Sequence, residues 1–307
     1  MMKNRRTRRV AAALVVVALG AAACSSSSTS SSTTAKSSLP TTVIPTQAKV
    51  ATVAALVPAS VASAGQVTFA MDASYPPDEF IAPGTNTIVG MDADLGKAIA
   101  EVMGLKPVEK NVTFDAIIPG LAAGKYDIGL SSFTDTLARQ KVVDFVDYFQ
   151  AGEAFYVKAD SMTNFTALTS LCGHSVAVES GTVEETDGKQ ANTDCKAAGK
   201  GGVTVQSFSD QNAVNLAVSS GRADVGFADS QVAGYVVAQS NGAFKLSGEA
   251  FAVAPYGIAC PKGNGMAQAV AAAVSELMNN GTYAKILKKW GVESGAVNGV
   301  ALNGATS

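Results

Sequence analysis

The stretch YDIGLSSFT, residues 126–134, combines a strand pattern with a polar loop. Its first five residues predict a short buried strand, and the residues after it form a polar loop at the carboxyl end of that strand. Open α/β sheets bind their ligands at this edge. The stretch therefore predicts a strand that leads into a binding loop containing Ser131, Ser132 and Thr134.

Apolar strands alternate with helical periodicity on both sides of this loop. A strand over 67–71 and helices over 94–102 and 114–121 precede it. Strands over 175–179, 203–206, 223–227 and 256–260 follow it, with helices from 182, over 211–220, after 229, over 266–278 and over 283–290. This alternation is typical of α/β architecture. Since the chain has 307 residues and cores divide beyond about 250–300 residues, we expect two lobes.

The N-terminus, residues 1–23, predicts a secretory signal peptide. A basic stretch over 3–9 precedes an apolar run over 10–19 that is too short for a transmembrane helix. The sequence AAAC, residues 21–24, resembles a bacterial lipobox, although Ala21 stands where Leu is more usual. We expect Cys24 to carry a lipid and residues 24–65, rich in Ser, Thr and Ala, to be a flexible tether. The protein is then exported and lipid-anchored on the outer face of the cell membrane.

The other cysteines fit an exported protein. Cys172 and Cys195 lie in one region, where a strand and the helix after it would close a modest loop, so we predict a disulfide between them. Cys260 is then the odd one, and we expect a buried thiol. His174 is the only histidine, which argues against a histidine-rich metal site and against most histidine-based catalysis. We expect no metal site.

Charge and motifs exclude further classes. The net charge of −2 comes without a long basic run in the body of the chain, so we expect no nucleic-acid partner. Residues 90–97 superficially resemble a phosphate loop, but the spacing of the glycines is wrong and Ala98 follows the lysine. Cys172 beside His174 is a nominal thiol–imidazole pair without a third orienting group.

Short motifs in a fixed order identify a family. These motifs are residues 72–77, 90–95, 114–121, 131–139, 143–145, 179–182, 221–224, 228–230, 255–259 and 281–283. With them, the chain between residues 56 and 291 resembles the family 3 extracellular solute-binding proteins, the polar amino-acid receptors of ABC importers, in their lipoprotein form.

The resemblance implies a two-lobed periplasmic-binding-protein fold of type II. Each lobe is a mixed sheet flanked by helices, and the ligand lies in the cleft between the lobes. Lobe 1 comprises 66–156 and 251–295, lobe 2 comprises 157–250, and 296–307 form a C-terminal tail. The strands that cross between the lobes are expected near Tyr156 and Phe251. No cofactor is implied, and the partners are a small amino acid and a transporter permease. We expect a monomer.

Two charged residues match the family's ligand contacts. Arg139 stands where a guanidinium grips the ligand carboxylate, and its planar fork suits that task. Asp229 stands where a carboxylate accepts hydrogen bonds from the ligand ammonium. Without the matching motifs, Arg139 would be interpreted as a surface helix cation and Asp229 as a helix N-cap; the motifs reverse that order.

Polar and aromatic residues complete the expected pocket. Ser131, Ser132 and Thr134 would bind the carboxylate or merely cap their loop. Gly181 and Thr182 begin a helix, where Thr182 and Glu185 form a capping box and free amides favour an anion. Val183 replaces a hydroxyl residue of many relatives, which removes one contact. The rings of Tyr75 and Phe114 would form walls, although Phe114 could be a core residue.

Acidic residues suggest the ligand class. Asp72 ends the first strand beside Tyr75, and Glu179 ends the strand before Gly181. Two acids near one pocket favour a cationic or strongly polar side chain over an acidic or apolar one. Alternatively, one or both of these carboxylates bind hinge backbone amides and never touch ligand. Asp78 stands where many relatives have Phe, so we expect a wetter pocket rim.

The function indicated is ligand capture by closure of two lobes, followed by delivery to a permease. An enzyme on the same fold, of the dehydratase type, is the main alternative of another class. A ligand-binding sensor of a membrane kinase is a third.

Overall fold

The computed structural model describes residues 39–306. The predicted signal peptide, the predicted lipidation site Cys24 and the first part of the predicted tether lie outside the described residues. No helix within residues 39–306 is long and apolar enough to cross a membrane.

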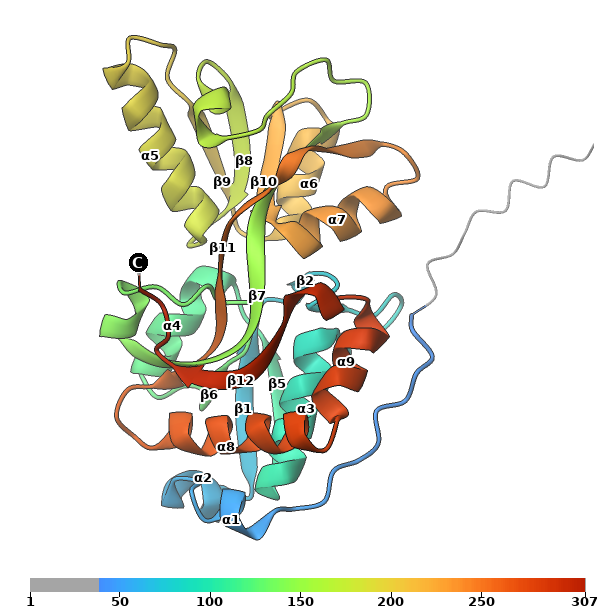
Figure 1. Cartoon of the computed structure of the whole chain (residues 1–307), viewed down its shortest axis with the longest axis vertical. Helices are drawn as coiled ribbons and strands as arrows, with labels where there is room; N and C mark the ends of the chain where they lie inside the picture. Colours follow the sequence, from blue (N-terminus) through green and yellow to red (C-terminus); the bar gives the residue numbers. More distant parts are fainter. Residues whose placement is uncertain (1–38, 307) are drawn as a thin grey trace, which may run out of the picture. The chain divides into compact units, whose positions relative to one another are not determined.

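One mixed sheet runs through both lobes (Figure 1). Its strand order is β5-β1-β6-β11-β7-β10-β8-β9, and β12 also pairs with β7. The strands are β1 (Gln66–Met71), β5 (Lys106–Asn111), β6 (Ile128–Gly129), β7 (Val143–Lys158), β8 (Ser175–Glu179), β9 (Thr204–Phe208), β10 (Val225–Asp229), β11 (Phe244–Pro261) and β12 (Ala296–Leu302). A second small sheet consists of β2 (Ser74–Tyr75), β3 (Glu79–Ile81) and β4 (Ile88–Val89). The two-lobed α/β fold expected from the sequence is thereby confirmed.

Lobe 1 places helices on both faces of its strands. Along β1, Val67, Phe69 and Met71 face a core shared with α3 (Met91–Met103), α8 (Met266–Asn279) and α9 (Thr282–Trp290). Ala70 faces the opposite way, against α4 (Phe114–Ala122). This alternation follows from the two-residue period of a strand. It fixes which side chains of β1 pack against each layer of helices.

Lobe 2 repeats the arrangement with its own core. Helix α5 (Val183–Ala197) covers one face of β8 and β10. The other face is covered by α6 (Gln211–Ser219) and α7 (Ser230–Gln239). Because β8, β9 and β10 are parallel neighbours, their carboxyl ends meet at one edge. Glu179 and Asp229 end two of these strands, so both lie at the edge that faces lobe 1.

Two long strands connect the lobes. In lobe 1, β7 pairs with β11 from Val143 onward, and in lobe 2 the same two strands pair again up to Lys158. The pairing is irregular between Phe251 and Ala254, and Ala252 has a φ of +51°. Tyr156 already packs in the core of lobe 2. The crossing of β7 therefore comes a few residues before the position expected from the sequence, because the lobe 2 core begins at Ala154.

The end of the predicted tether is folded, which corrects that prediction. Residues 51–64 form two short helices, α1 (Ala51–Ala54) and α2 (Ala59–Ala64). Val53 of α1, Val61 of α2 and Val57 between the two helices are buried in the core of lobe 1. The composition did not reveal this, because only three valines among small residues dock the segment. The predicted C-terminal tail likewise contains β12, which pairs with β7.

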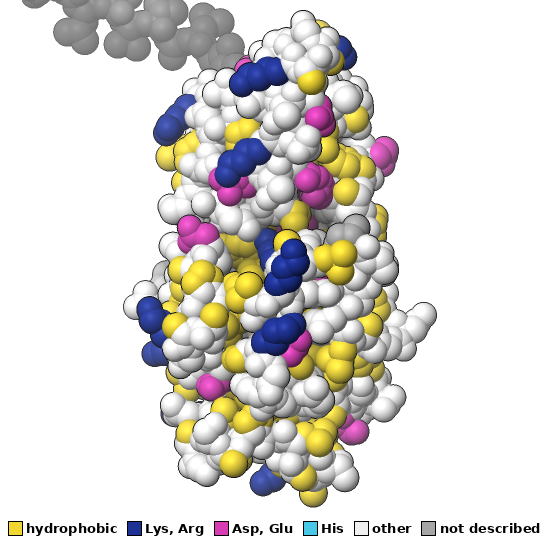
Figure 2. Space-filling view, turned by 90° about the vertical axis from the view of Figure 1, so that its left-hand side faces the viewer, with side chains coloured by type: hydrophobic (Ala, Val, Ile, Leu, Met, Phe, Trp, Pro, Cys, Tyr) yellow, Lys and Arg dark blue, Asp and Glu magenta, His cyan; other side chains and the backbone are white. Residues whose placement is uncertain are grey.

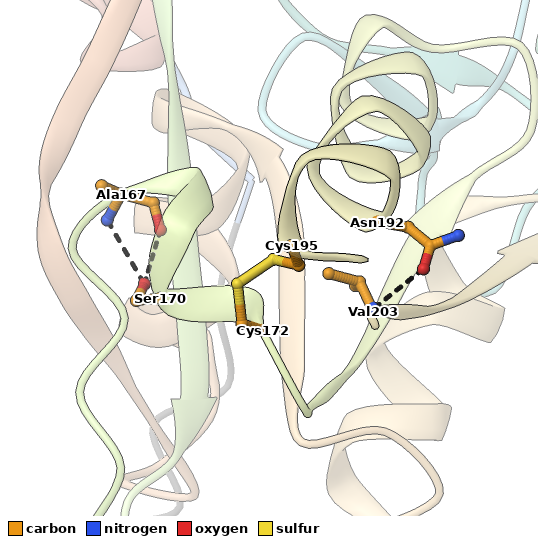
Figure 3. The surroundings of a disulfide bond; sticks show 6 residues. All are labelled: Ala167, Ser170, Cys172, Asn192, Cys195 and Val203. Atoms are coloured by element: carbon orange, nitrogen blue, oxygen red, sulfur yellow. Dashed lines mark hydrogen bonds between the residues drawn. A yellow bond between two sulfur atoms is a disulfide. The ribbon is translucent and has the colours of Figure 1, made fainter. Parts of the chain in front are cut away.

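The predicted disulfide is present in lobe 2. It joins Cys172, after the short helix η2 (Leu168–Leu171), to Cys195 near the end of α5 (Figure 3). In the same region Asn192 of α5 accepts a hydrogen bond of 3.1 Å from the backbone N–H of Val203. Both links hold α5 to its lobe. Since Cys172 is oxidised, the nominal pair with His174 has no thiol. Cys260 takes no part in this disulfide, and its free thiol is fully buried in lobe 1.

Charges of both signs are interspersed on the face of the molecule shown in Figure 2. On the face shown in Figure 2, lysine and arginine side chains alternate with acidic and apolar ones rather than gathering into one patch. The described surface exposes only scattered large apolar side chains, among them Leu137, Met162, Leu216 and Val253.

Candidate functional site

A pocket lies between the two lobes, at the carboxyl ends of their strands. It brings together every side chain that the sequence suggested for ligand binding except Gly181, which lies beside it. The lining residues are Asp72, Tyr75, Phe114, Ser131, Ser132, Thr134, Arg139, Glu179, Thr182, Val183, Glu184 and Asp229.

Arg139 bridges the two lobes. It belongs to a single turn, η1 (Arg139–Lys141). Its guanidinium donates to the carbonyl of Thr134 at 2.7 Å and to the carbonyl of Gly181, in lobe 2, at 2.9 Å. The same group lies 5.4 Å from the ring centre of Phe114 and 5.5 Å from that of Phe133. Arg139 is therefore held in the pocket, not displayed on a surface helix.

Asp229 is the corresponding charged group of lobe 2. It precedes α7, but its side chain makes no capping hydrogen bond to that helix. Instead Oδ2 accepts a hydrogen bond of 2.9 Å from the Tyr75 hydroxyl of lobe 1. Burial raises the pKa of Asp229 to about 6, against the hydrogen bonds from Tyr256 and Tyr75 and the charge of Arg139. Asp229 therefore does not cap α7, and its carboxyl group lines the pocket as a hydrogen-bond acceptor.

Two further carboxyl groups share the pocket. Asp72 and Glu179 come from different lobes, both line the pocket, and they expose only 5% and 3% of their surface. Asp72 Oδ2 accepts from the backbone N–H of Phe114 at 2.9 Å. Glu179 Oε1 has no donor within the described residues. The alternative in which these carboxylates only bind backbone amides therefore accounts for one oxygen of Asp72. It does not account for Oε1 of Glu179.

The phenyl ring of Phe114 lines the pocket and also packs on its neighbour. It stacks on Phe133 with ring centres 4.4 Å apart, and it remains partly exposed. Phe114 therefore lines the pocket and at the same time packs on the buried ring of Phe133. Tyr75, which is buried, packs with the lobe 2 cluster although it belongs to lobe 1.

The predicted capping box is present at the start of α5, but the Glu185 carboxylate accepts from Gly181 and not from Thr182. Thr182 accepts from the backbone N–H of Glu185 at 3.2 Å, while the Glu185 carboxylate accepts from the N–H of Gly181 at 2.9 Å. Gly181 has a φ of +83°, and a Cβ at this position would lie 2.9 Å from the Cβ of Asp115 in lobe 1. A glycine is required because the backbones of the two lobes approach so closely here.

The serines of the binding loop are engaged by buried acids that sequence reasoning did not identify. Ser131 donates to Glu79 at 2.7 Å. Ser132, whose φ is +49°, donates from its N–H to Asp92 at 2.9 Å and from its hydroxyl to Asp78 at 3.0 Å. These three acids are fully buried, and burial is the main cause that raises the pKa of each. They hold the loop in place.

Asp78 corrects the expectation of a wet pocket rim. Its side chain is buried and accepts a hydrogen bond of 2.8 Å from Gln231 of lobe 2. The same amide nitrogen of Gln231 lies 2.7 Å from the Tyr256 hydroxyl. Polar donors from both lobes exclude water from this carboxyl group, which the sequence could not reveal because Gln231 is remote in the chain.

Glu184 is a pocket residue that the sequence analysis missed. It lies in the first turn of α5, where an acidic residue is ordinarily explained by the helix dipole. Its side chain is nevertheless buried, and burial together with the charges of Asp229 and Glu153 raises its pKa well above the usual range. Within the described residues no group of three or more His, Cys, Asp or Glu is placed to hold a metal ion.

Comparison with known proteins gives consistent results. The sequence profile described as "Bacterial extracellular solute-binding proteins, family 3" matches residues 67–293. The arginine-binding protein ArgT of Corynebacterium glutamicum is 34% identical over 250 residues, which cover 81% of this chain and 82% of that protein.

Solved structures agree with the sequence comparison. An ancestral arginine-binding protein bound to arginine is 37% identical, with a TM-score of 0.67 over 74% of this chain and 98% of that one. An ancestral arginine-binding protein bound to glutamine is also 37% identical, with a TM-score of 0.68 over 75% of this chain and 99% of that one.

Proposed function

The chain belongs to the bacterial extracellular solute-binding proteins of family 3, and we propose that it is the receptor of an ABC importer for a cationic amino acid, arginine foremost. Its relatives are amino-acid-binding proteins of transporters, and an amino acid is the class of ligand that it receives. The identity of that amino acid and its delivery to a permease are the proposed part.

One observation carries the choice of ligand. Asp72 and Glu179 are buried acids in one pocket, and no ion pair of the described residues includes either of them. A buried carboxylate without a partner is costly, so a ligand that supplies a cation gains the compensating interaction. A guanidinium offers five donors in a fixed plane, which suits two carboxyl groups from opposite sides.

The α-carboxylate and α-ammonium groups of the ligand would be bound by Arg139 and Asp229. Arg139 would receive the α-carboxylate, with the free amides at the start of α5 beside it. Asp229 would accept from the α-ammonium, and the rings of Tyr75 and Phe114 would enclose the aliphatic chain. Because contacts come from both lobes, ligand binding favours the closed state over the open one.

Several interlobe hydrogen bonds accompany this closure. Besides those of Arg139, Tyr75 and Asp78, the backbone N–H of Gln211 in lobe 2 donates to the Ser74 hydroxyl of lobe 1 at 3.0 Å. A permease that recognises the joined surfaces of both lobes can distinguish a loaded receptor from an open one.

Titration calorimetry with arginine, lysine, glutamine, glutamate and leucine tests the proposal. Arginine should bind most tightly, lysine and glutamine should follow, and glutamate and leucine should bind weakly or not at all. At a hundredfold excess over its dissociation constant, the preferred ligand should stabilise the fold by about 2.7 kcal/mol. Tighter binding of glutamate or leucine than of arginine would refute the ligand assignment.

Export follows from the family, whose members are extracellular binding proteins. The finer location is proposed: cleavage after Ala23, a lipid on Cys24, and a monomer anchored at the outer face of the membrane. In the native host, Cys24→Ser should move the protein from the membrane fraction to the medium or periplasm. An unchanged distribution would argue for another mode of attachment.

A further inference from the structure

We propose that a second cavity beside Asp229 receives a residue attached to the α-nitrogen of the ligand, so that the protein also binds dipeptides with a C-terminal arginine. The N-terminal ammonium of the dipeptide then binds the carboxylate of Glu153. This inference rests on the proposed function, since the C-terminal arginine occupies the amino-acid pocket described above.

A cavity of about 660 Å³ adjoins the amino-acid pocket, on the side of the strands that connect the lobes. The residues that line both spaces are Thr134, Arg139, Thr182, Val183 and Asp229. Two of them, Arg139 and Asp229, are the residues that would bind the α-carboxylate and the α-ammonium. A group attached to the α-nitrogen therefore has the cavity beside it.

This cavity is present while the lobes are closed. In the same structure Arg139 donates to the Gly181 carbonyl of the other lobe. A second ligand residue in the cavity therefore does not have to hold the lobes apart. Small side chains of β7 and β11 leave the space free: Ala151, Ala252 and Ala254.

Glu153 lies directly beside Asp229 in the sheet. The two residues are partners in the antiparallel pairing of β7 with β10, so their side chains leave the same face with Cβ atoms about 5 Å apart. Successive nitrogens of a peptide are at most about 3.6 Å apart along the chain. When Asp229 accepts from the α-nitrogen of the arginine, Glu153 is thus within reach of the ammonium of the residue before it.

The carboxyl group of Glu153 lacks a partner. The residue exposes only 5% of its surface, and its Oε2 accepts no hydrogen bond within residues 39–306. No ion pair of these residues includes it. Burial, together with the charges of Asp187 and Asp229, raises its pKa to about 8. A ligand cation would supply both the opposite charge and the missing donors.

The lining of the cavity favours a cation over an anion. Besides Glu153, the acidic residues Asp135, Asp187 and Asp229 line it, whereas Arg139 is the one basic residue among the described lining residues. The Arg139 guanidinium already donates to two backbone carbonyls. An ammonium group meets attraction in this cavity, and a second carboxylate meets repulsion.

Titration calorimetry with arginine, glycyl-arginine, Nα-acetylarginine and arginyl-glycine tests the assignment. Glycyl-arginine should bind at least about tenfold more tightly than Nα-acetylarginine, which has the same amide but lacks the ammonium that would bind Glu153. Arginyl-glycine should not bind, because its carboxylate and its α-ammonium belong to different residues. Mass spectrometry of the complex should recover the intact dipeptide and not free arginine.

Two variants isolate the cavity. In Glu153→Gln, glycyl-arginine should lose at least about tenfold in affinity, whereas arginine and Nα-acetylarginine should change by less than about twofold. Retained arginine binding also shows that this variant is folded. Ala254→Leu narrows the cavity at a half-buried strand position. It should weaken glycyl-arginine and Nα-acetylarginine but not arginine.

Glu109→Gln is the matched control. Glu109 also has a raised pKa, about 7, but it lies on β5 and lines neither the pocket nor the cavity. All four compounds should behave toward this variant as they do toward the unchanged protein.

The outcomes separate the two proposals. If arginine does not bind, the proposed function fails. If arginine binds and glycyl-arginine does not, only the assignment of the cavity is disproved. The same conclusion follows if glycyl-arginine and Nα-acetylarginine bind equally, or if Glu153→Gln weakens arginine as much as glycyl-arginine.

Discussion

The hydroxyl of Tyr75 in lobe 1 donates a hydrogen bond of 2.9 Å to Oδ2 of Asp229 in lobe 2. This bond closes the lobes and orients the carboxylate that would receive the ligand ammonium. Tyr75→Phe should therefore weaken amino-acid binding about tenfold, since a hydrogen bond to a charged group contributes about 1.5 kcal/mol. Calorimetry measures the loss.

Tyr126→Phe serves as the control for this change, because the Tyr126 ring packs against Gly120 of α4 and takes no part in the interlobe contacts. It should bind ligand like the unchanged protein. Equal affinities for Tyr75→Phe and Tyr126→Phe would show that the Tyr75 bond adds nothing to closure.

Arg139→Lys should weaken binding of every α-amino acid by at least about tenfold while the thermal midpoint stays nearly constant. Lysine keeps the positive charge but lacks the planar guanidinium. That guanidinium donates to the Thr134 and Gly181 carbonyls and would also bind the ligand carboxylate. Arg222→Lys is the comparison, since Arg222 lies over the Phe208 ring in lobe 2, outside the pocket. If both variants bind alike, Arg139 is not the carboxylate receptor.

Gly181→Ala should reduce both stability and affinity. A non-glycine residue in left-handed conformation costs about 1–2 kcal/mol, and the added methyl would also press on Asp115 of lobe 1, 2.9 Å away. Gly199→Ala separates these effects, because Gly199 has a φ of +69° with nothing within 4 Å. Gly199→Ala should therefore lose stability but keep its ligand affinity. Small-angle scattering of the ligand-bound protein should show incomplete closure for Gly181→Ala only.

Replacing Cys172 and Cys195 together by alanine should lower the free energy of unfolding by about 3 kcal/mol, the amount expected for a loop of this length. Ligand affinity should change little, because the disulfide fastens the far end of α5 and does not line the pocket. Urea denaturation with and without reductant measures the first effect, and calorimetry the second. A large loss of affinity would mean that the position of α5 depends on this link.

Local pattern was enough to predict most of the architecture. Helix α6 is one example: Asp210 accepts from the N–H of Ala213 as its N-cap, at 2.9 Å, and the helix spans Gln211–Ser219, one residue short of the prediction. The disulfide was predictable because both cysteines lie in one short segment. The tether was misjudged over residues 51–64, since docking of these two helices depends on a core built by α3 and α8.

Hydrophobic periodicity and capping act over a few residues, so the sequence was enough to predict the ends of β1 at Met71 and of β8 at Glu179. In contrast, β5, the full length of β7 and β11, and the end of β10 at Asp229 were not predicted. What the residues at these strand ends contact depends on the packed lobes. Asp78 is buried against Gln231, 153 positions away, and Glu184 faces the pocket rather than solvent. Burial raises the pKa of a carboxyl group and removes its water, and burial is a property of the packed lobes that no short segment contains.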